Sequence, residues 1–170
     1  MPNWCEGSMK LRGKPANILR FVKEGLDLYC GDDAHLVDKS VWLNVLEGED
    51  YVQIDFLDKN IPPHESIHIN GTRRAFIRSD EHNYIYFRTL PEVVIVPFAI
   101  KQAWGYDYGE FRKIAKTYEI DIRLYGIECG SGYVEDVEIL DNGDTINDLS
   151  PVYENYNDYE WNCPFPWIGG

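Results

Sequence analysis

The chain has 170 residues, 44% of them hydrophobic and 14% aromatic, and its 16 basic and 29 acidic side chains give a net charge of −13. This length and composition predict a single packed domain over residues 1–170 and exclude a wholly disordered chain. The sequence shows no apolar run long enough to span a membrane and no secretory leader, and its negative charge argues against a general nucleic-acid binder, which neutralises phosphates with Lys and Arg.

The first thirty residues predict a strand followed by a helix. Apolar and polar side chains alternate over residues 5–12, as in a strand with one buried face. Gly13 interrupts this pattern, and Pro15 suits the first turn of a helix. Apolar residues then recur at helical spacing from Ala16 to Leu28, so the sequence predicts a helix over that range.

The middle of the chain is rich in strand-like runs. Residues 41–46 fit either a strand or a buried helical turn. Further strands are predicted at residues 51–57, 66–69, 75–77, 84–89 and 92–100. Pro97 lies within the last run and predicts an edge, a bulge or an early end, because proline has no N–H to donate.

The clearest element is a helix from Asp107 to Tyr118. Asp107 and Glu110 fit a capping box, and apolar side chains recur every three or four residues after them. Strands are predicted at residues 120–124 and 133–140, with a tight turn at Asn142-Gly143. Residues 149–170 show neither period and are predicted to form an irregular, aromatic-rich tail.

The order of these elements predicts an α+β fold. A ferredoxin-like β-α-β-β-α-β core over about residues 1–30 and 66–148 fits best. In this interpretation, residues 31–65 are a strand-rich insertion, and the tail is an irregular C-terminal extension.

Two regions of the chain resemble a known family. The opening Pro2-Asn3-Trp4-Cys5 is followed by a strand, Gly13 and a helix, and a second Trp, Trp104, stands just before the 107–118 helix. Together these regions resemble the YubB-like proteins of phages and plasmids, which have a ferredoxin-like domain. The resemblance implies that fold, a mobile-element origin and a location in the bacterial host cytoplasm. It supplies no activity and no catalytic residues.

Negative charge is concentrated in the C-terminal third. Residues 119–170 carry twelve acidic side chains against Arg123 alone, which accounts for −11 of the total −13. This segment is either a well-solvated surface or a surface that attracts a basic partner, and its aromatics either anchor an interface or pin the tail to the sheet. The candidate partner-binding residues are Glu128, Glu135, Asp136, Glu138, Asp141, Asp144, Tyr156, Asp158, Tyr159 and Glu160.

Four cysteines and four histidines raise the question of a metal site, although no CxxC or HExxH motif is present. In the expected fold Cys5 begins the first strand, Cys30 ends the first helix and Cys129 ends a later strand. They would then meet at one sheet edge, near Cys163 or His35 as further ligands. Such a set suits tetrahedral Zn(II). The competing interpretation is that the cysteines are free, buried core residues.

No pattern in the sequence supports catalysis, so we expect a protein that is not an enzyme. Gly130-Ser131-Gly132 lacks the spacing of a nucleophile elbow, and no phosphate loop is present. The acidic segment and the family resemblance together suggest an inhibitor of a host defence nuclease of the CRISPR–Cas effector type. It would occupy a basic nucleic-acid-binding surface of that nuclease and block guide or DNA loading, without itself contacting nucleic acid. The alternative is a small metal-stabilised structural or regulatory protein with no nuclease target.

Overall fold

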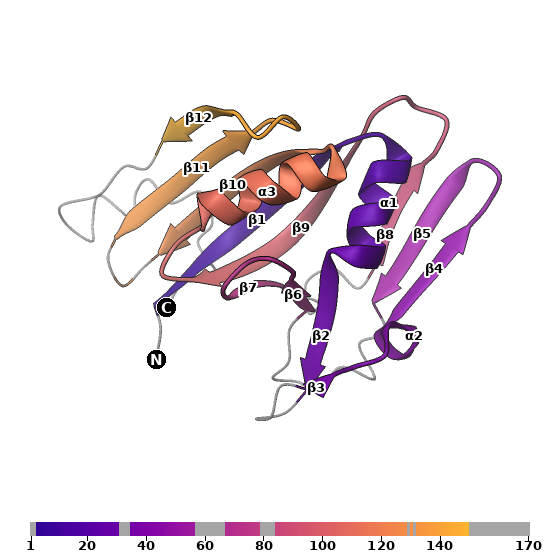
Figure 1. Cartoon of the computed structure of the whole chain (residues 1–170), viewed down its shortest axis with the longest axis horizontal. Coiled ribbons are helices and arrows are strands. Elements are labelled where there is room, and N and C mark those ends of the chain that lie inside the picture. The colour runs from indigo at the N-terminus through magenta and orange to yellow at the C-terminus, as the bar shows by residue number, and fades with distance from the viewer. Residues whose placement is uncertain are drawn as a thin grey trace.

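Two antiparallel sheets and three helices make up the part of the chain that the structure, a computed structural model, describes: residues 3–30, 35–56, 67–78, 84–128, 130 and 132–149 (Figure 1). The larger sheet has nine strands in the order β12-β11-β10-β1-β9-β7-β6-β2-β3, and the smaller has the order β4-β5-β8. The elements in chain order are β1 (Trp4–Gly13), α1 (Pro15–Glu24), β2 (Leu26–Cys30), β3 (His35–Leu36), α2 (Lys39–Trp42), β4 (Leu43–Glu47), β5 (Tyr51–Phe56), β6 (Ile67–Ile69), β7 (Ala75–Ile77), β8 (Tyr84–Arg88), β9 (Val94–Ala103), α3 (Tyr108–Tyr118), β10 (Asp121–Glu128), β11 (Tyr133–Ile139) and β12 (Thr145–Leu149).

The predicted ferredoxin-like core is wrong, because strands dominate the chain and the large sheet has nine strands instead of four. The β6–β7 hairpin accounts for much of the difference. It lies between β9 and β2, where Ala75 pairs with Gln102 and Ile69 pairs with Leu26. Alternation in the sequence predicts these short strands but carries no information about the strands beside them.

Helices α1 and α3 lie on the same face of the large sheet (Figure 1). The α3 prediction is confirmed in detail: the Asp107 side chain accepts a hydrogen bond from the Glu110 N–H, and the helix ends at Glu119 in the left-handed region. By contrast, α1 stops at Glu24 and Leu26 already belongs to β2, so the predicted extension of this helix to Leu28 is wrong.

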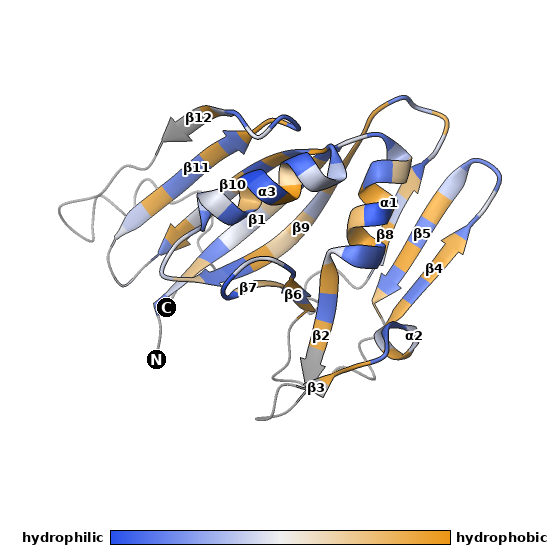
Figure 2. Ribbon diagram, in the orientation of Figure 1, coloured by the Kyte–Doolittle hydropathy of each residue, from blue (hydrophilic) through white to orange (hydrophobic). Residues whose placement is uncertain are grey.

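Along the strands of the large sheet, successive side chains point alternately to the helix-covered face and to the opposite face, which we call the second face. Strand β11 alternates between hydrophobic and hydrophilic residues along most of its length (Figure 2). On β1, Cys5, Met9 and Leu11 are fully buried on the helix-covered face. The second face therefore receives Trp4 and the other even-numbered side chains of β1.

Pro97 lies inside β9, which continues to Ala103 without a register shift, so the predicted bulge and early end are wrong; the predicted edge holds locally, because β9 pairs only with β1 at this level. The Arg78 N–H donates to the Ala99 carbonyl, which means that the backbone groups of Ala99 point toward β7. Pro97, two residues earlier, points its nitrogen the same way. At that level β7 has already ended at Ile77, which pairs with Ile100, so the missing N–H interrupts no pairing with β7.

The smaller sheet is formed by β4 and β5 of the predicted insertion together with β8. Buried side chains of both sheets belong to one hydrophobic cluster within the described residues. Trp42 is fully buried in it and stacks on Phe56, with ring centroids 6.4 Å apart. No described helix combines the length and the apolar character needed to cross a membrane.

Candidate functional site

Two of the predicted partner-binding acids lie in the interior. Glu128 is 2% exposed and Glu135 is 8% exposed. Glu135 shares its side of β11 with the buried Val137 and Ile139, so it faces the helices rather than solvent. Their assignment to a partner-binding surface is therefore wrong.

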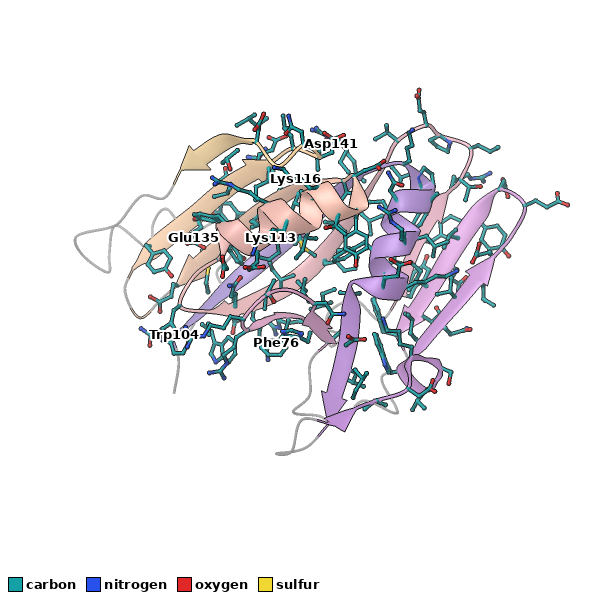
Figure 3. All side chains as sticks on the ribbon, viewed as in Figure 1. Phe76, Trp104, Lys113, Lys116, Glu135 and Asp141 are labelled. Carbon is teal, nitrogen blue, oxygen red and sulfur yellow. The ribbon has the colours of Figure 1, made fainter. Side chains whose placement is uncertain are left out.

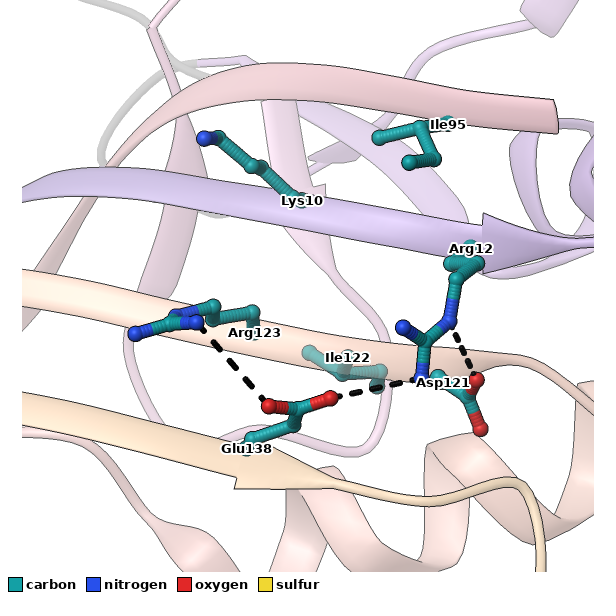
Figure 4. Close-up of a pocket in the computed structure, with 7 residues that line it drawn as sticks. All are labelled: Lys10, Arg12, Ile95, Asp121, Ile122, Arg123 and Glu138. Atoms are coloured by element: carbon teal, nitrogen blue, oxygen red, sulfur yellow. Dashed lines mark hydrogen bonds and ion pairs between the residues drawn. The ribbon is translucent and has the colours of Figure 1, made fainter. Parts of the chain in front are cut away.

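Two further acids of the predicted set are held in ion pairs on the second face. Asp136 binds Arg123 at 2.9 Å, and Glu138 binds Arg12 at 3.3 Å. Arg12 also pairs with Asp121 at 2.7 Å. Arg12, Asp121, Arg123 and Glu138 line a depression of about 240 Å³ together with Lys10, Ile95 and Ile122 (Figure 4). Because it carries both signs of charge, the depression is not the acidic surface that the sequence predicts.

Asp141 and Asp144 are exposed as predicted. They lie in and beside the turn between β11 and β12, and Glu119 is exposed at the end of α3. No ion pair forms at any of these three carboxylates within the described part of the chain. The remaining predicted residues, Tyr156, Asp158, Tyr159 and Glu160, lie outside the described residues.

Two of the predicted metal ligands, Cys5 and Cys30, lie on strands far apart in the large sheet. Cys30 ends β2 rather than a helix, and β2 lies four strands away from the β1 strand of Cys5, or roughly 19 Å at about 4.8 Å per strand. His35 in β3 pairs with Cys30, while Cys129 and Cys163 lie outside the described residues. Among the residues that are described, no group of three or more His, Cys, Asp or Glu side chains is arranged to hold a metal.

Cys5 instead belongs to a buried polar cluster with Glu135 and Tyr106. The Cys5 thiol lies 3.6 Å from Glu135 Oε2, and the Tyr106 backbone N–H donates to the same oxygen at 2.9 Å. Burial raises the pKa of the Cys5 thiol, and the nearby Glu135 charge raises it further. The thiol is therefore protonated at neutral pH and buried, which makes it a poor nucleophile.

This cluster predicts that the free energy of unfolding falls as pH rises above about 9, the ordinary pKa of a thiol. In the folded protein Cys5 stays protonated, whereas the unfolded chain releases the proton, so alkaline pH favours unfolding. Urea unfolding between pH 7 and 10 measures the decline. The C5S variant should show a shallower decline over this range, and an equally steep one would contradict the assignment to Cys5.

The turn from Trp104 to Tyr106 is held by the same cluster. Trp104 and Gly105 have φ angles of 62° and 96°. The Trp104 N–H donates to the Asn3 carbonyl at 2.9 Å, and Tyr106 is bound to Glu135 as described. A Cβ on Gly105 would lie 2.9 Å from Glu135 Oε1, so a side chain there would collide with the carboxylate. Glu135 thus positions the turn that presents Trp104.

Trp104 is exposed and strained. The residue is 55% exposed, although tryptophan has a large hydrophobic side chain. A non-glycine residue in the left-handed region costs about 1–2 kcal/mol, and a bulky one is rare there. The fold therefore keeps a large aromatic ring at the surface in a conformation that is itself unfavourable.

Cations and aromatic rings surround Trp104 and form what we call the basic–aromatic surface. The Arg73 guanidinium lies 5.2 Å from the Trp104 ring centroid, and that of Arg74 lies 5.7 Å from Trp104 and 5.5 Å from Trp4. Lys101 lies 5.4 Å from the Trp4 centroid, and Phe76 meets Trp4 edge to face at 6.1 Å. The surface consists of Trp4, Arg73, Arg74, Phe76, Lys101 and Trp104.

This surface and the exposed acids lie at different ends of the molecule. Figure 3 shows Trp104 and Phe76 along one edge and Asp141 at the opposite edge. Trp4 begins β1, whereas Asp141 lies beside Asp121, which pairs with Arg12 near the other end of β1. At about 3.3 Å per residue, these two ends are roughly 30 Å apart. Within the described residues, the exposed Asp141 is therefore separated from the basic–aromatic surface.

No family model, curated protein or solved structure matches this chain. The resemblance to YubB-like proteins stays a prediction, and its mobile-element origin with it.

Proposed function

We propose that this chain is a non-enzymatic binding protein that holds an anionic partner on the basic–aromatic surface. The observation that carries the proposal is Trp104, exposed and in the left-handed region beneath two arginines. Tryptophan and arginine are the residues that most often dominate binding energy at interfaces. Backbone strain of this kind is concentrated at functional sites, and a binding role explains why the strained residue is present.

The two arginines favour an anion as the partner. Arg73 and Arg74 are both exposed, and neither forms an ion pair with any residue of the described ranges. Guanidinium groups present N–H donors in a planar fork that matches carboxylate or phosphate oxygens. Contact with the Trp rings holds these arginines in place while leaving their donors available.

Heparin, a general polyanion, tests this proposal without assuming a ligand class. A protein with a net charge of −13 is expected to pass through a heparin column, but we expect this one to be retained in 50 mM NaCl. The R73A/R74A variant should flow through. The K113A/K116A variant removes the same charge from α3 on the helix-covered face and should be retained like wild type (Figure 3). Flow-through of the wild type would contradict the proposal.

The acidic end of the molecule favours a second candidate function. Glu119, Asp141 and Asp144 are exposed, and the described residues place no cation in an ion pair with them. These carboxylates would complement a basic channel of a host defence nuclease of the CRISPR–Cas effector type and hinder the loading of guide or target nucleic acid. Electrostatic attraction of this kind mainly accelerates association.

Association kinetics with a purified effector nuclease test the second candidate. The E119Q/D141N/D144N variant is expected to associate several-fold more slowly at low salt, because the attracting charges are lost. The matched control E24Q/E49Q/E92Q removes three exposed carboxylates from other elements and should associate at the wild-type rate. Equal rates for the two variants, or an affinity that does not change with salt, would rule this candidate out.

A further inference from the structure

We infer that the anionic partner of the basic–aromatic surface is a single-stranded nucleic acid, an inference that rests on the proposed function. Such a strand carries an anionic phosphate and a planar base in every unit. The surface offers cations and aromatic rings in alternation: Arg73 on Trp104, Arg74 on both indoles, and Lys101 on Trp4. Proteins that bind single strands combine these two kinds of side chain.

The dimensions of the surface suit a short run of nucleotides. Because Arg74 Cζ lies 5.5 Å from the Trp4 centroid and 5.7 Å from the Trp104 centroid, the two indoles are within about 11 Å of each other. Stacked nucleotides rise about 3.4 Å each along a strand, so at most about three of them span the space between the indoles. Phe76, 6.1 Å from Trp4, extends the aromatic part of the surface onto β7.

The aromatic rings of the basic–aromatic surface favour a single-stranded nucleic acid over other polyanions. In a duplex the bases are stacked on each other and are not available to an indole, so a surface for duplexes relies on its cations alone. An acidic peptide would pair with Arg73 and Arg74 but carries no planar group beside each charge. The exposure of Trp104 therefore favours unpaired bases.

Local charge explains why the total charge of −13 does not prevent this binding. The exposed Asp141 and Asp144 lie near the far end of β1, roughly 30 Å from Trp4. At physiological salt, charges are screened over about 8 Å. Total charge alone predicts no contact with nucleic acid, but the cations next to the bound strand would be Arg73, Arg74 and Lys101. Glu6, which lies opposite Lys101 where β1 pairs with β9, is held in an ion pair with Arg78 at 3.0 Å.

Fluorescence anisotropy with a labelled ten-residue oligothymidylate tests the inference on the full chain. Three cations on phosphates predict that the slope of log affinity against log salt is about −2 between 50 and 200 mM NaCl, at about −0.7 per phosphate. The R73A/R74A variant should bind at least ten-fold more weakly with a slope near −0.7, while R73K/R74K should keep the slope. K113A/K116A should stay within two-fold of wild type.

Competition identifies the ligand class. Unlabelled oligothymidylate should displace the probe, whereas a duplex of equal length and polyglutamate should compete at least ten-fold less well. Equal competition by polyglutamate or by the duplex would overturn the inference, as would equal affinity of the R73A/R74A variant. If the protein is retained on heparin but binds no oligonucleotide, the single-strand inference is overturned and the proposed function still stands. If the wild type shows neither heparin retention nor oligonucleotide binding, the proposed function is refuted as well.

Discussion

Replacing Trp104 by alanine is expected to lower the affinity for single-stranded DNA by roughly 10- to 100-fold. Stacking of one base on an aromatic side chain contributes about 1–3 kcal/mol when measured by alanine substitution. Residue Trp104 is 55% exposed, so removal of its ring leaves no cavity in the hydrophobic core. Anisotropy titrations in 50 mM NaCl measure the affinity, and thermal unfolding shows whether the fold is retained.

A matched aromatic control separates stacking from a general effect of surface area. Tyr84 is 56% exposed at the start of β8, in the smaller sheet. The Y84A variant should bind the oligonucleotide like wild type. If the W104A and Y84A variants bind equally well and melt at similar temperatures, Trp104 is not part of a binding surface.

Replacing Gly7 by alanine is expected to destabilise the fold by about 3 kcal/mol, the upper end of the usual cost of overpacking. Gly7 pairs with Gly126 where β1 meets β10. A Cβ on Gly7 would lie 1.9 Å from the Tyr125 carbonyl oxygen and 2.7 Å from the Gly126 Cα. Both are backbone atoms, so the strands themselves would have to separate. Urea unfolding measures the loss of stability.

Gly109 is the matched control for this substitution. It is exposed in the first turn of α3, and a Cβ there would lie 3.4 Å from Asp107 Oδ1, an ordinary contact. Alanine is the better helix former by about 0.5–1 kcal/mol, so the G109A variant should be as stable as wild type or slightly more stable. A G7A variant with wild-type stability would show that β1 and β10 do not pair in this register.

Elements defined by their own side chains were predictable from the sequence. The capping residue and apolar spacing of α3 and the alternation of β1 both lie within short windows. The end of α1 was not predictable in this way, because Leu26 and Leu28 fit the face of a helix as well as that of a strand. Their place is decided by Ile69 and Ile67 of β6, which pair with them from forty residues away.

In the candidate site too, features that depend on one segment were predictable, and features that depend on the pairing of distant segments were not. The sequence does contain the signal that Glu135 is buried, since it alternates with Val137 and Ile139 along one strand, and a face assignment would have found it. The basic–aromatic surface has no comparable local signal. Arg73-Arg74 and Trp104-Gly105 lie thirty residues apart and meet because β7 pairs with β9, which no pattern within either segment predicts.

Indole and backbone ¹H–¹⁵N spectra of the full chain, recorded with and without oligothymidylate, test the central claim most directly. We predict that the largest shifts occur at the indole N–H groups of Trp4 and Trp104 and at the backbone of Arg73, Arg74 and Lys101. Trp42, buried against Phe56 in the hydrophobic cluster, should not shift. Shifts centred on Asp141 and Asp144, with the Trp4 and Trp104 signals unmoved, would contradict the account.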